Sequence, residues 1–161
     1  MMDFKAIDIE KDPGVECIIG QGNFSIFTVE DLAVKLKTTT PSIKFGIAMN
    51  EAKPKLVRAE GNDDELKSMA AKACLEIGAG HVFVIMMREA FPINVLNAVK
   101  EYPSVCSIYA ASENPLQVVV GTTDLGRFVV GAVDGTAADA LESEEQKAER
   151  KEILGMIGYR I

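Results

Sequence analysis

The sequence predicts an α/β fold, in which residues 1–161 form a single domain with a mixed β-sheet covered by about four helices. The chain length suits one domain with a proper hydrophobic core. Apolar residues make up 48% and charged residues 25%, the balance of an ordinary soluble protein. Short apolar runs typical of strands alternate with segments that have helical spacing, and no linker or repeat divides the chain.

The predicted strands are runs that are rich in β-branched residues or that alternate between apolar and polar positions. They lie near residues 4–9, 15–19, 43–49, 56–59, 82–87, 105–111, 116–122 and 128–133. The first three helices are expected in the gaps between these runs, and the fourth after the last of them.

Capping residues and charge mark the helices. Thr28 is expected to begin the first helix. Asn62 is expected to cap the second helix, which covers residues 63–77 and ends at Gly78. The fourth helix runs through the charged stretch 142–151, which indicates a solvated face.

The order strand, helix, strand over residues 56–87 describes a crossover, so its two strands should run parallel. Asn62, Asp63 and Arg88 then lie at the carboxyl end of these strands, and His81 lies at the opposite end. His81 and Arg88 are separated by roughly 23 Å at the usual rise per strand residue. These two groups therefore cannot share one small-molecule site within a single subunit.

Charge and cysteine content narrow the class of protein. The formal net charge of −7 argues against a nucleic-acid partner, which needs a clustered basic surface. The longest apolar runs, such as 82–87, are too short to span a membrane, and the first residues lack the features of a signal peptide. Cys17, Cys74 and Cys106 lie among apolar neighbours, which favours buried thiols in a reducing compartment. We expect a cytoplasmic protein without a membrane partner.

His81 is the only histidine, and it follows Gly78 and Gly80 at the start of an apolar strand. Imidazole titrates near neutral pH and can act as a base, a metal ligand or a nitrogen nucleophile. We expect no metal site, because such sites usually need further nitrogen or sulfur ligands and the chain has no second histidine. His81 is a candidate for proton transfer or phosphoryl acceptance; alternatively, it only packs where the helix meets the strand.

Four other polar residues are candidates for ligand binding. Tight turns are expected to bring Glu51 and Arg127 to the end of the sheet where His81 lies. Arg127 could hold a phosphate, and Glu51 could orient the imidazole or accept hydrogen bonds from a ribose. Asn62 and Asp63 open the second helix, where acidic neighbours favour sugar hydroxyls over phosphate. Each also has a plain structural explanation, as a solvated charge or a helix cap.

Familiar catalytic motifs are absent from the sequence. There is no GxxxxGK[ST] phosphate loop, no complete dinucleotide fingerprint, no Cys-x-x-Cys pair and no G-x-S-x-G turn. The sequence motifs therefore do not predict a conventional ATP-binding kinase.

Several segments together resemble the adenosine-specific kinase family, a group of small prokaryotic domains. They are residues 29–32, 45–48, 56–63, 80–84, 91–97, 108–111, 114–118 and 131–135, and they cover nearly the whole chain in order. The resemblance implies binding of adenosine or AMP, a histidine that carries a phosphoryl group, and a homo-oligomer that is a trimer or a multiple of it. The histidine of Gly80-His81-Val82-Phe83-Val84 falls on the family's Gly-His-x-Phe-Val segment.

Two functions are left open by the sequence and the resemblance. The first is an adenosine/AMP-binding phosphotransfer protein in which His81 accepts the phosphoryl group, with Mg²⁺ expected only alongside a phosphoryl donor. Glu51, Asn62, Asp63 and Arg127 are its predicted ligand-binding residues. The second is a non-catalytic module that binds adenine nucleotides. A nucleoside site that draws on both ends of the sheet would need two subunits.

Overall fold

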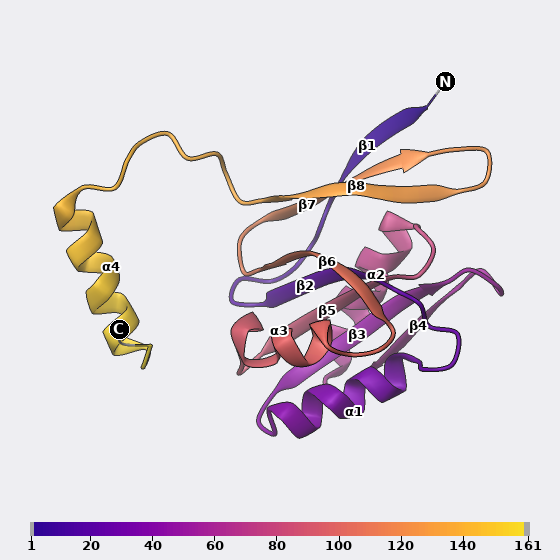
Figure 1. The fold of residues 1–161 in the computed structure, drawn as a ribbon, viewed down its shortest axis with the longest axis horizontal. Helices are drawn as coiled ribbons and strands as arrows, with labels where there is room; N and C mark the ends of the chain where they lie inside the picture. Colours follow the sequence, from indigo (N-terminus) through magenta and orange to yellow (C-terminus); the bar gives the residue numbers. More distant parts are fainter. Residues whose placement is uncertain (1, 160–161) are drawn as a thin grey trace.

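The computed structural model describes residues 2–159 and confirms the α/β class with four helices. The elements are β1 (Asp3–Asp8), β2 (Glu16–Gly22), α1 (Val29–Thr39), β3 (Lys44–Glu51), β4 (Leu56–Gly61), α2 (Asp64–Ile77), β5 (Val82–Arg88), α3 (Pro92–Lys100), β6 (Val105–Ser112), β7 (Leu116–Thr122), β8 (Arg127–Asp134) and α4 (Glu144–Met156) (Figure 1).

The strands are divided between two sheets, a division that the sequence did not predict. One sheet has five strands in the order β4-β3-β5-β2-β6, and the other has three in the order β1-β7-β8. Neighbouring strands in each sheet are antiparallel. The predicted crossover is confirmed, because β4 and β5 run in the same direction with β3 between them. An isolated parallel bridge between Ala79 and Arg127 links the two sheets.

Two hydrophobic cores lie on opposite faces of the five-stranded sheet. On one face, α2 and the three-stranded sheet pack together; on the other, α1 and α3 do so (Figure 1). The central strand β5 supplies both cores, since Val82, Val84 and Met86 face the first, while Phe83 and Ile85 face the second. A strand that is buried on both faces has a continuous apolar sequence, and this pattern is why the sequence predicted β5.

The start of α2 differs from the sequence prediction. Asp63 is the N-cap, and its Oδ1 accepts a hydrogen bond of 3.0 Å from the amide of Leu66. Asn62 still belongs to the edge of the sheet: its Oδ1 accepts from the amide of Phe45 and its Nδ2 donates to the carbonyl of Ile43, both at 2.8 Å. The prediction that Asn62 caps the helix is therefore wrong, because its side-chain amide pairs with the backbone of Ile43 and Phe45 at the start of β3 instead.

The predicted burial of the thiols holds for two cysteines. Cys17 and Cys74 are free and buried, and burial raises the pKa of the Cys17 thiol to about 12. Cys106 is exposed on the edge strand β6, so the prediction is wrong there. Within residues 2–159, no helix is long and apolar enough to cross a membrane.

The fourth helix stands apart from the two sheets (Figure 1). Its charged stretch is solvated, as predicted, and none of its residues is buried. Ser143 caps the helix by accepting a hydrogen bond of 3.2 Å from the amide of Gln146. Arg150 also pairs with Glu142 at 2.8 Å. The structure of α4 is therefore locally defined although it lacks packing against the body.

Helix α2 lies directly against Gly46 of β3, and this contact generates a stability prediction. A Cβ at Gly46 would lie well inside contact distance of the α2 backbone at Leu66 and Lys67. Gly46→Ala should therefore force α2 off the sheet and cost about 3 kcal/mol, the upper end for overpacking. Urea denaturation measures the loss. Gly131→Ala is the matched control in β8, where a Cβ meets no atom within 4 Å; equal losses for both variants would contradict this packing.

Candidate functional site

His81 lies in the tight turn between α2 and β5, with its side chain 30% exposed. Its φ of +57° is in the left-handed region, which costs a residue with a Cβ on the order of 1–3 kcal/mol. The amide of His81 donates to the carbonyl of Asn50 at 2.8 Å, and its carbonyl accepts from the amide of Gly22 at 2.9 Å. The ends of β3 and β2 therefore fix the backbone of His81 while its imidazole stays open to solvent.

A carboxylate and a guanidinium lie beside the imidazole. Glu51 ends β3, and its Oε1 is 3.9 Å from Nε2 of His81. The other carboxylate oxygen, Oε2, lies 2.8 Å from Nε of Arg58 on the adjacent strand β4. Glu51 is only 15% exposed, whereas Arg58 is 49% exposed. The carboxylate of Glu51 is thus placed between two basic side chains.

A buried amide ties the turn of His81 to the end of α2. Asn50 is 8% exposed, and its Nδ2 donates to the carbonyls of Cys74 at 2.8 Å and Ala79 at 2.9 Å. Cys74 belongs to the last turn of α2, and Ala79 belongs to the turn that leads to His81. Each carbonyl also accepts a backbone hydrogen bond, from Gly78 and Val82 respectively, so the side chain of Asn50 adds a second bond on both sides of the turn.

A second amide holds the same turn from the other side. Nε2 of Gln21 on β2 donates to the carbonyl of Gly80 at 2.9 Å. The hydroxyl of Tyr109 on β6 donates in turn to Oε1 of Gln21 at 3.2 Å. Burial raises the pKa of Tyr109, so its hydroxyl remains a donor at neutral pH.

Arg127 lies at the same end of the structure as His81, as predicted. It begins β8 and forms the bridge with Ala79. Its Nη1 donates to the carbonyls of Glu76 at 2.9 Å and Ile77 at 3.4 Å. A cation is favourable at the carboxyl end of a helix, so Arg127 anchors α2 to the three-stranded sheet.

The other predicted ligand-binding residues lie at the far end of β5. Asn62 and Asp63 hold the junction of β4 and α2 as described above. Arg88 ends β5, with Nη1 2.6 Å from Oε2 of Glu65 and Nη2 3.2 Å from Oδ2 of Asp12. The structure therefore brings Glu51 to His81, but it keeps Asn62 and Asp63 apart from them.

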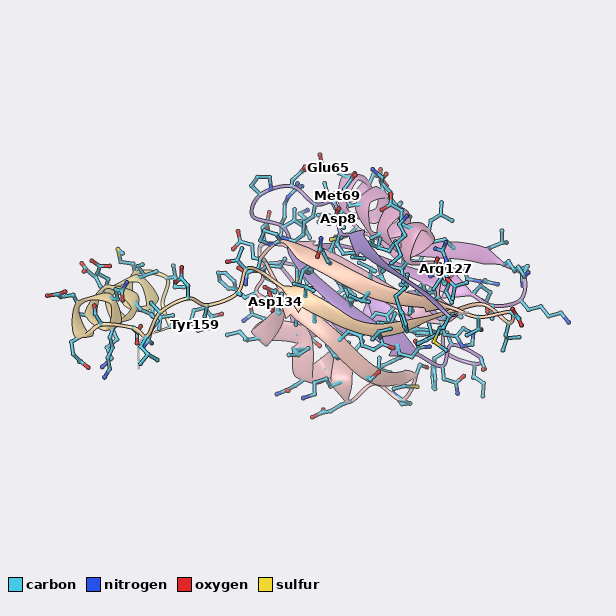
Figure 2. All side chains as sticks on the ribbon, turned by 90° about the horizontal axis from the view of Figure 1, so that it is seen from above. Asp8, Glu65, Met69, Arg127, Asp134 and Tyr159 are labelled. Carbon is cyan, nitrogen blue, oxygen red and sulfur yellow. The ribbon has the colours of Figure 1, made fainter. Side chains whose placement is uncertain are left out.

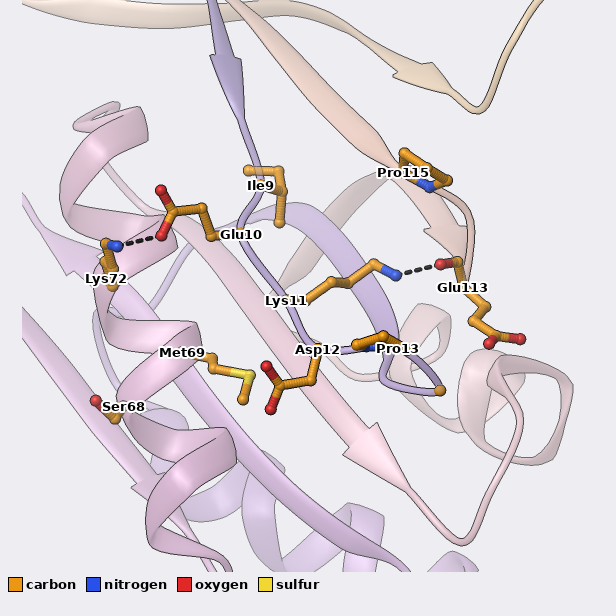
Figure 3. A pocket seen from close by; sticks show the side chains of 11 residues that line it. Ile9, Glu10, Lys11, Asp12, Pro13, Ser68, Met69, Lys72, Glu113 and Pro115 are labelled. Carbon is orange, nitrogen blue, oxygen red and sulfur yellow. Dashed lines mark hydrogen bonds and ion pairs between the residues drawn. The ribbon is translucent and has the colours of Figure 1, made fainter.

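A cavity of about 630 Å³ lies between the β1–β2 loop and α2, and we call it the α2 cavity (Figure 3). Its lining includes Ile9, Glu10, Lys11, Asp12, Pro13, Ser68, Met69 and Lys72. Lys72 pairs with Glu10 inside it, and Lys11 donates to the carbonyl of Glu113. One lining residue, Asp12, pairs with Arg88 at the end of β5 that is away from His81.

A second cavity, of about 520 Å³, lies beside the end of α2. Two cations, Lys5 and Arg127, line it together with Asp8, Glu10 and Glu76. Neither cavity is lined by His81. Within residues 2–159, no cluster of three or more His, Cys, Asp or Glu side chains could hold a metal ion.

Sequence reasoning found His81 and Glu51 but missed the residues that hold them. Arg58 on β4 holds Glu51, Gln21 on β2 holds the turn at Gly80, and Tyr109 on β6 holds Gln21. Their contacts depend on the pairing and register of β2 with β6 and of β3 with β4, which the sequence does not display. Of these contacts, only the one from Arg58 could have been found from the sequence. The hairpin expected after Glu51 places β4 beside β3, and therefore Arg58 near Glu51.

The fold and the site define a small α/β protein that presents one histidine beside a carboxylate at the end of a five-stranded sheet. A family model described as adenosine specific kinase matches residues 7–160. The chain therefore belongs to the adenosine specific kinase family. Membership supports adenosine-related phosphotransfer as the general activity.

A solved structure agrees with this fold over the full chain. The crystal structure of the PH1918 protein from Pyrococcus horikoshii OT3 superposes with a TM-score of 0.95 at 63% sequence identity. The alignment covers 100% of this chain and 99% of that one. The comparison with curated proteins finds no match.

The role of Asn50 gives a testable prediction. Asn50→Ala removes two buried hydrogen bonds, although the carbonyls of Cys74 and Ala79 keep the amides of Gly78 and Val82 as donors. It should lower the free energy of unfolding by about 1–2 kcal/mol. Asn114→Ala is the matched control, because Asn114 is exposed and its side-chain amide donates to Asp134 at the surface. Urea denaturation compares the two variants. A loss at Asn50 no larger than the loss at Asn114 would show that the turn is held by other contacts.

Proposed function

We propose that the protein binds adenosine or AMP and transfers a phosphoryl group through His81. The observation that carries this proposal is the position of Glu51 Oε1, 3.9 Å from His81 Nε2, at a strained and solvent-accessible turn. Residues held in unfavourable backbone conformations concentrate at functional sites. Family membership supplies the substrate class, and the histidine supplies a nucleophile that needs no separate cofactor.

The carboxylate of Glu51 selects the nitrogen that reacts. A carboxylate facing Nε2 stabilises the tautomer that carries its proton on Nε2, which leaves the lone pair of Nδ1 free. A phosphoryl group approaching Nε2 would also meet the negative charge of Glu51. Both effects favour attack by Nδ1, and Arg58 holds the carboxylate in the orientation that this requires.

The proposed transfer has two steps. In the first, the Nδ1 lone pair forms a bond to phosphorus while the bond from phosphorus to the donor's leaving oxygen breaks, and that oxygen keeps the electron pair. The imidazole then carries a positive charge, which Glu51 stabilises. In the second, the 5′-hydroxyl oxygen of adenosine attacks phosphorus, the electron pair returns to Nδ1, and the hydroxyl proton passes to solvent. Mg²⁺ would enter with a nucleotide donor.

Arg127 is also proposed as a phosphate ligand. It lies at the correct end of the sheet, and with Lys5 it lines a cavity there. Its Nη1 is nevertheless engaged by the carbonyls of α2. These contacts favour the alternative function, a non-catalytic module that binds adenine nucleotides, since such a module needs no free cation on a transferring phosphate.

Separation of the two ends of β5 supports a proposed homo-oligomer, a trimer or a multiple of it. The α2 cavity is large enough for a nucleoside, and one lining residue, Asp12, pairs with Arg88 at the end of β5 near Asn62 and Asp63. His81 and Glu51 are at the opposite end. A nucleoside in the α2 cavity of one subunit would therefore meet the histidine of a neighbouring subunit.

Substitution of the histidine tests the proposal against its alternative. With adenosine and ATP, the wild-type protein should form AMP and ADP and gain an acid-labile phosphoryl group, seen as an increase in intact mass. His81→Ala should lose both. Calorimetric binding of adenosine without turnover or mass gain in the wild type would instead establish the binding module. Equal mass gain in His81→Ala would reject the assignment of the acceptor.

Substitution of the carboxylate tests the choice of nitrogen. ³¹P NMR of the phosphorylated protein should show the Nδ1 isomer of phosphohistidine. Glu51→Gln removes the charge but keeps the shape, and it should slow phosphorylation by about 100-fold or more if the carboxylate controls the tautomer. Glu60→Gln, on β4 with a half-buried side chain, is the control and should have no effect. A wild-type signal from the Nε2 isomer would contradict the proposed role of Glu51.

A further inference from the structure

The segment that joins β3 to β4 reverses the charge balance of the chain. The whole chain has 24 acidic and 17 basic side chains, which give a formal net charge of −7. Residues 51–58, which we call the β3–β4 hairpin, carry three cations, Lys53, Lys55 and Arg58, against the single anion Glu51. A local positive charge on an acidic protein directs anions to one place, because the rest of the surface repels them.

The cations of the β3–β4 hairpin are accessible to a ligand. Lys53 and Lys55 are exposed, and within residues 2–159 neither of them pairs with a carboxylate. Arg58 pairs with Glu51 through Nε, so the charge of that carboxylate is already balanced. The guanidinium is 49% exposed, and its two Nη groups can donate to a second anion.

The β3–β4 hairpin lies against the turn that carries His81. A Cβ placed on Gly80 would be 3.8 Å from the Cβ of Ala52 in the hairpin. The amide of His81 donates to the carbonyl of Asn50, the residue before the hairpin, at 2.8 Å. Glu51, the first residue of the hairpin, has its Oε1 3.9 Å from the imidazole. The imidazole and the cations are therefore at the same end of the sheet.

This end of the molecule lies away from α4. In Figure 1 the turn between β3 and β4 projects from the end of the five-stranded sheet that is opposite α4. Figure 2 shows Arg127 at this end and Tyr159 at the other. Arg127 is partly engaged, because its Nη1 donates to the carbonyls that end α2. The hairpin cations have no such contact within the described residues, so they are better placed to bind an anion.

The composition of the β3–β4 hairpin indicates the kind of anion. Three cations spread over six residues suit a chain of several phosphates better than a single carboxylate. The hairpin contains no aromatic side chain on which a base could stack. We therefore expect the hairpin to bind the phosphates and not a base. The sequence also lacks a phosphate loop, so a donor's phosphates need another cationic site beside the histidine.

We infer that the β3–β4 hairpin binds the polyphosphate chain of the phosphoryl donor, either a nucleoside triphosphate or an inorganic polyphosphate. The inference rests on the proposed function only for the role of the bound chain as the donor. The terminal phosphorus lies at the imidazole, and the phosphates farther from it lie along Lys53, Lys55 and Arg58. When Nδ1 attacks, the bond from phosphorus to the bridging oxygen breaks, and that oxygen keeps the electron pair. The hairpin cations stabilise the negative charge that develops on the departing chain.

Binding of sodium tripolyphosphate tests the site without any transfer. The parent protein carries His81→Asn, because asparagine accepts no phosphoryl group here and tolerates the positive φ of this position. Calorimetry without metal ions should show binding to this parent. Adding Lys53→Gln and Lys55→Gln should weaken the binding about 10-fold, since two exposed ion pairs with the phosphates are lost.

The matched control is Lys35→Gln with Lys44→Gln in the same parent. Both lysines are exposed, one on α1 and the other at the opposite end of β3, and the change in net charge is the same. This control should bind tripolyphosphate as the parent does. Equal weakening by the two pairs of substitutions, or no binding by the parent, would overturn the inference.

Donor kinetics on the protein with its histidine test the role of the bound chain. ATP and GTP should phosphorylate it with similar KM, and tripolyphosphate should compete with both. Whether tripolyphosphate also phosphorylates it distinguishes an inorganic donor from a nucleoside triphosphate. Lys53→Gln with Lys55→Gln should raise the KM for the donor about 10-fold and leave the KM for adenosine unchanged.

An unchanged KM for the donor in that double variant, or a strict requirement for adenine in the donor, would overturn the inference. Failure of the proposed function gives a different result. If tripolyphosphate binds through Lys53 and Lys55 but no donor phosphorylates the protein, the polyphosphate site is supported and the phosphotransfer is rejected.

Discussion

The buried amide of Asn50 is the contact on which the geometry of the site depends. Its two hydrogen bonds join the last turn of α2 to the turn before His81. Gly78 ends α2 in the left-handed conformation, and His81 adopts a similar φ three residues later. Backbone hydrogen bonds from the ends of β3 and β2 hold His81 itself. The side-chain amide of Asn50 adds the link between this turn and the last turn of α2.

This constraint connects the site to both sheets. Asn50 precedes Glu51 on β3, so the strand that pins the turn also delivers the carboxylate to the imidazole. Ala79, in the same turn, bridges to Arg127 at the start of β8, and Arg127 binds the carbonyls that end α2. The three-stranded sheet is therefore attached to α2 at the turn that carries His81.

The sequence predicted those features that depend on local pattern. The apolar run of β5, the glycine after α2 and the return after Glu51 together placed His81 and Glu51 at one end of the sheet, and the structure agrees. Prediction failed for Asn62, because an amide before a helix can cap it or pair with a neighbouring strand. It also missed the second sheet, since β1 pairs with β7 from Asp3 to Thr122, across most of the chain. Pairings of that kind leave no local signature.

The central claim is that the phosphoryl group passes through His81 on its way to adenosine. A chase experiment tests it most directly. The protein is phosphorylated with labelled donor, freed of all nucleotide, and mixed rapidly with adenosine. The account predicts that label leaves the protein and appears in AMP at least as fast as steady-state turnover. If the phosphorylated protein keeps its label and AMP forms only when the donor is present, transfer is direct and His81 is not an intermediate carrier.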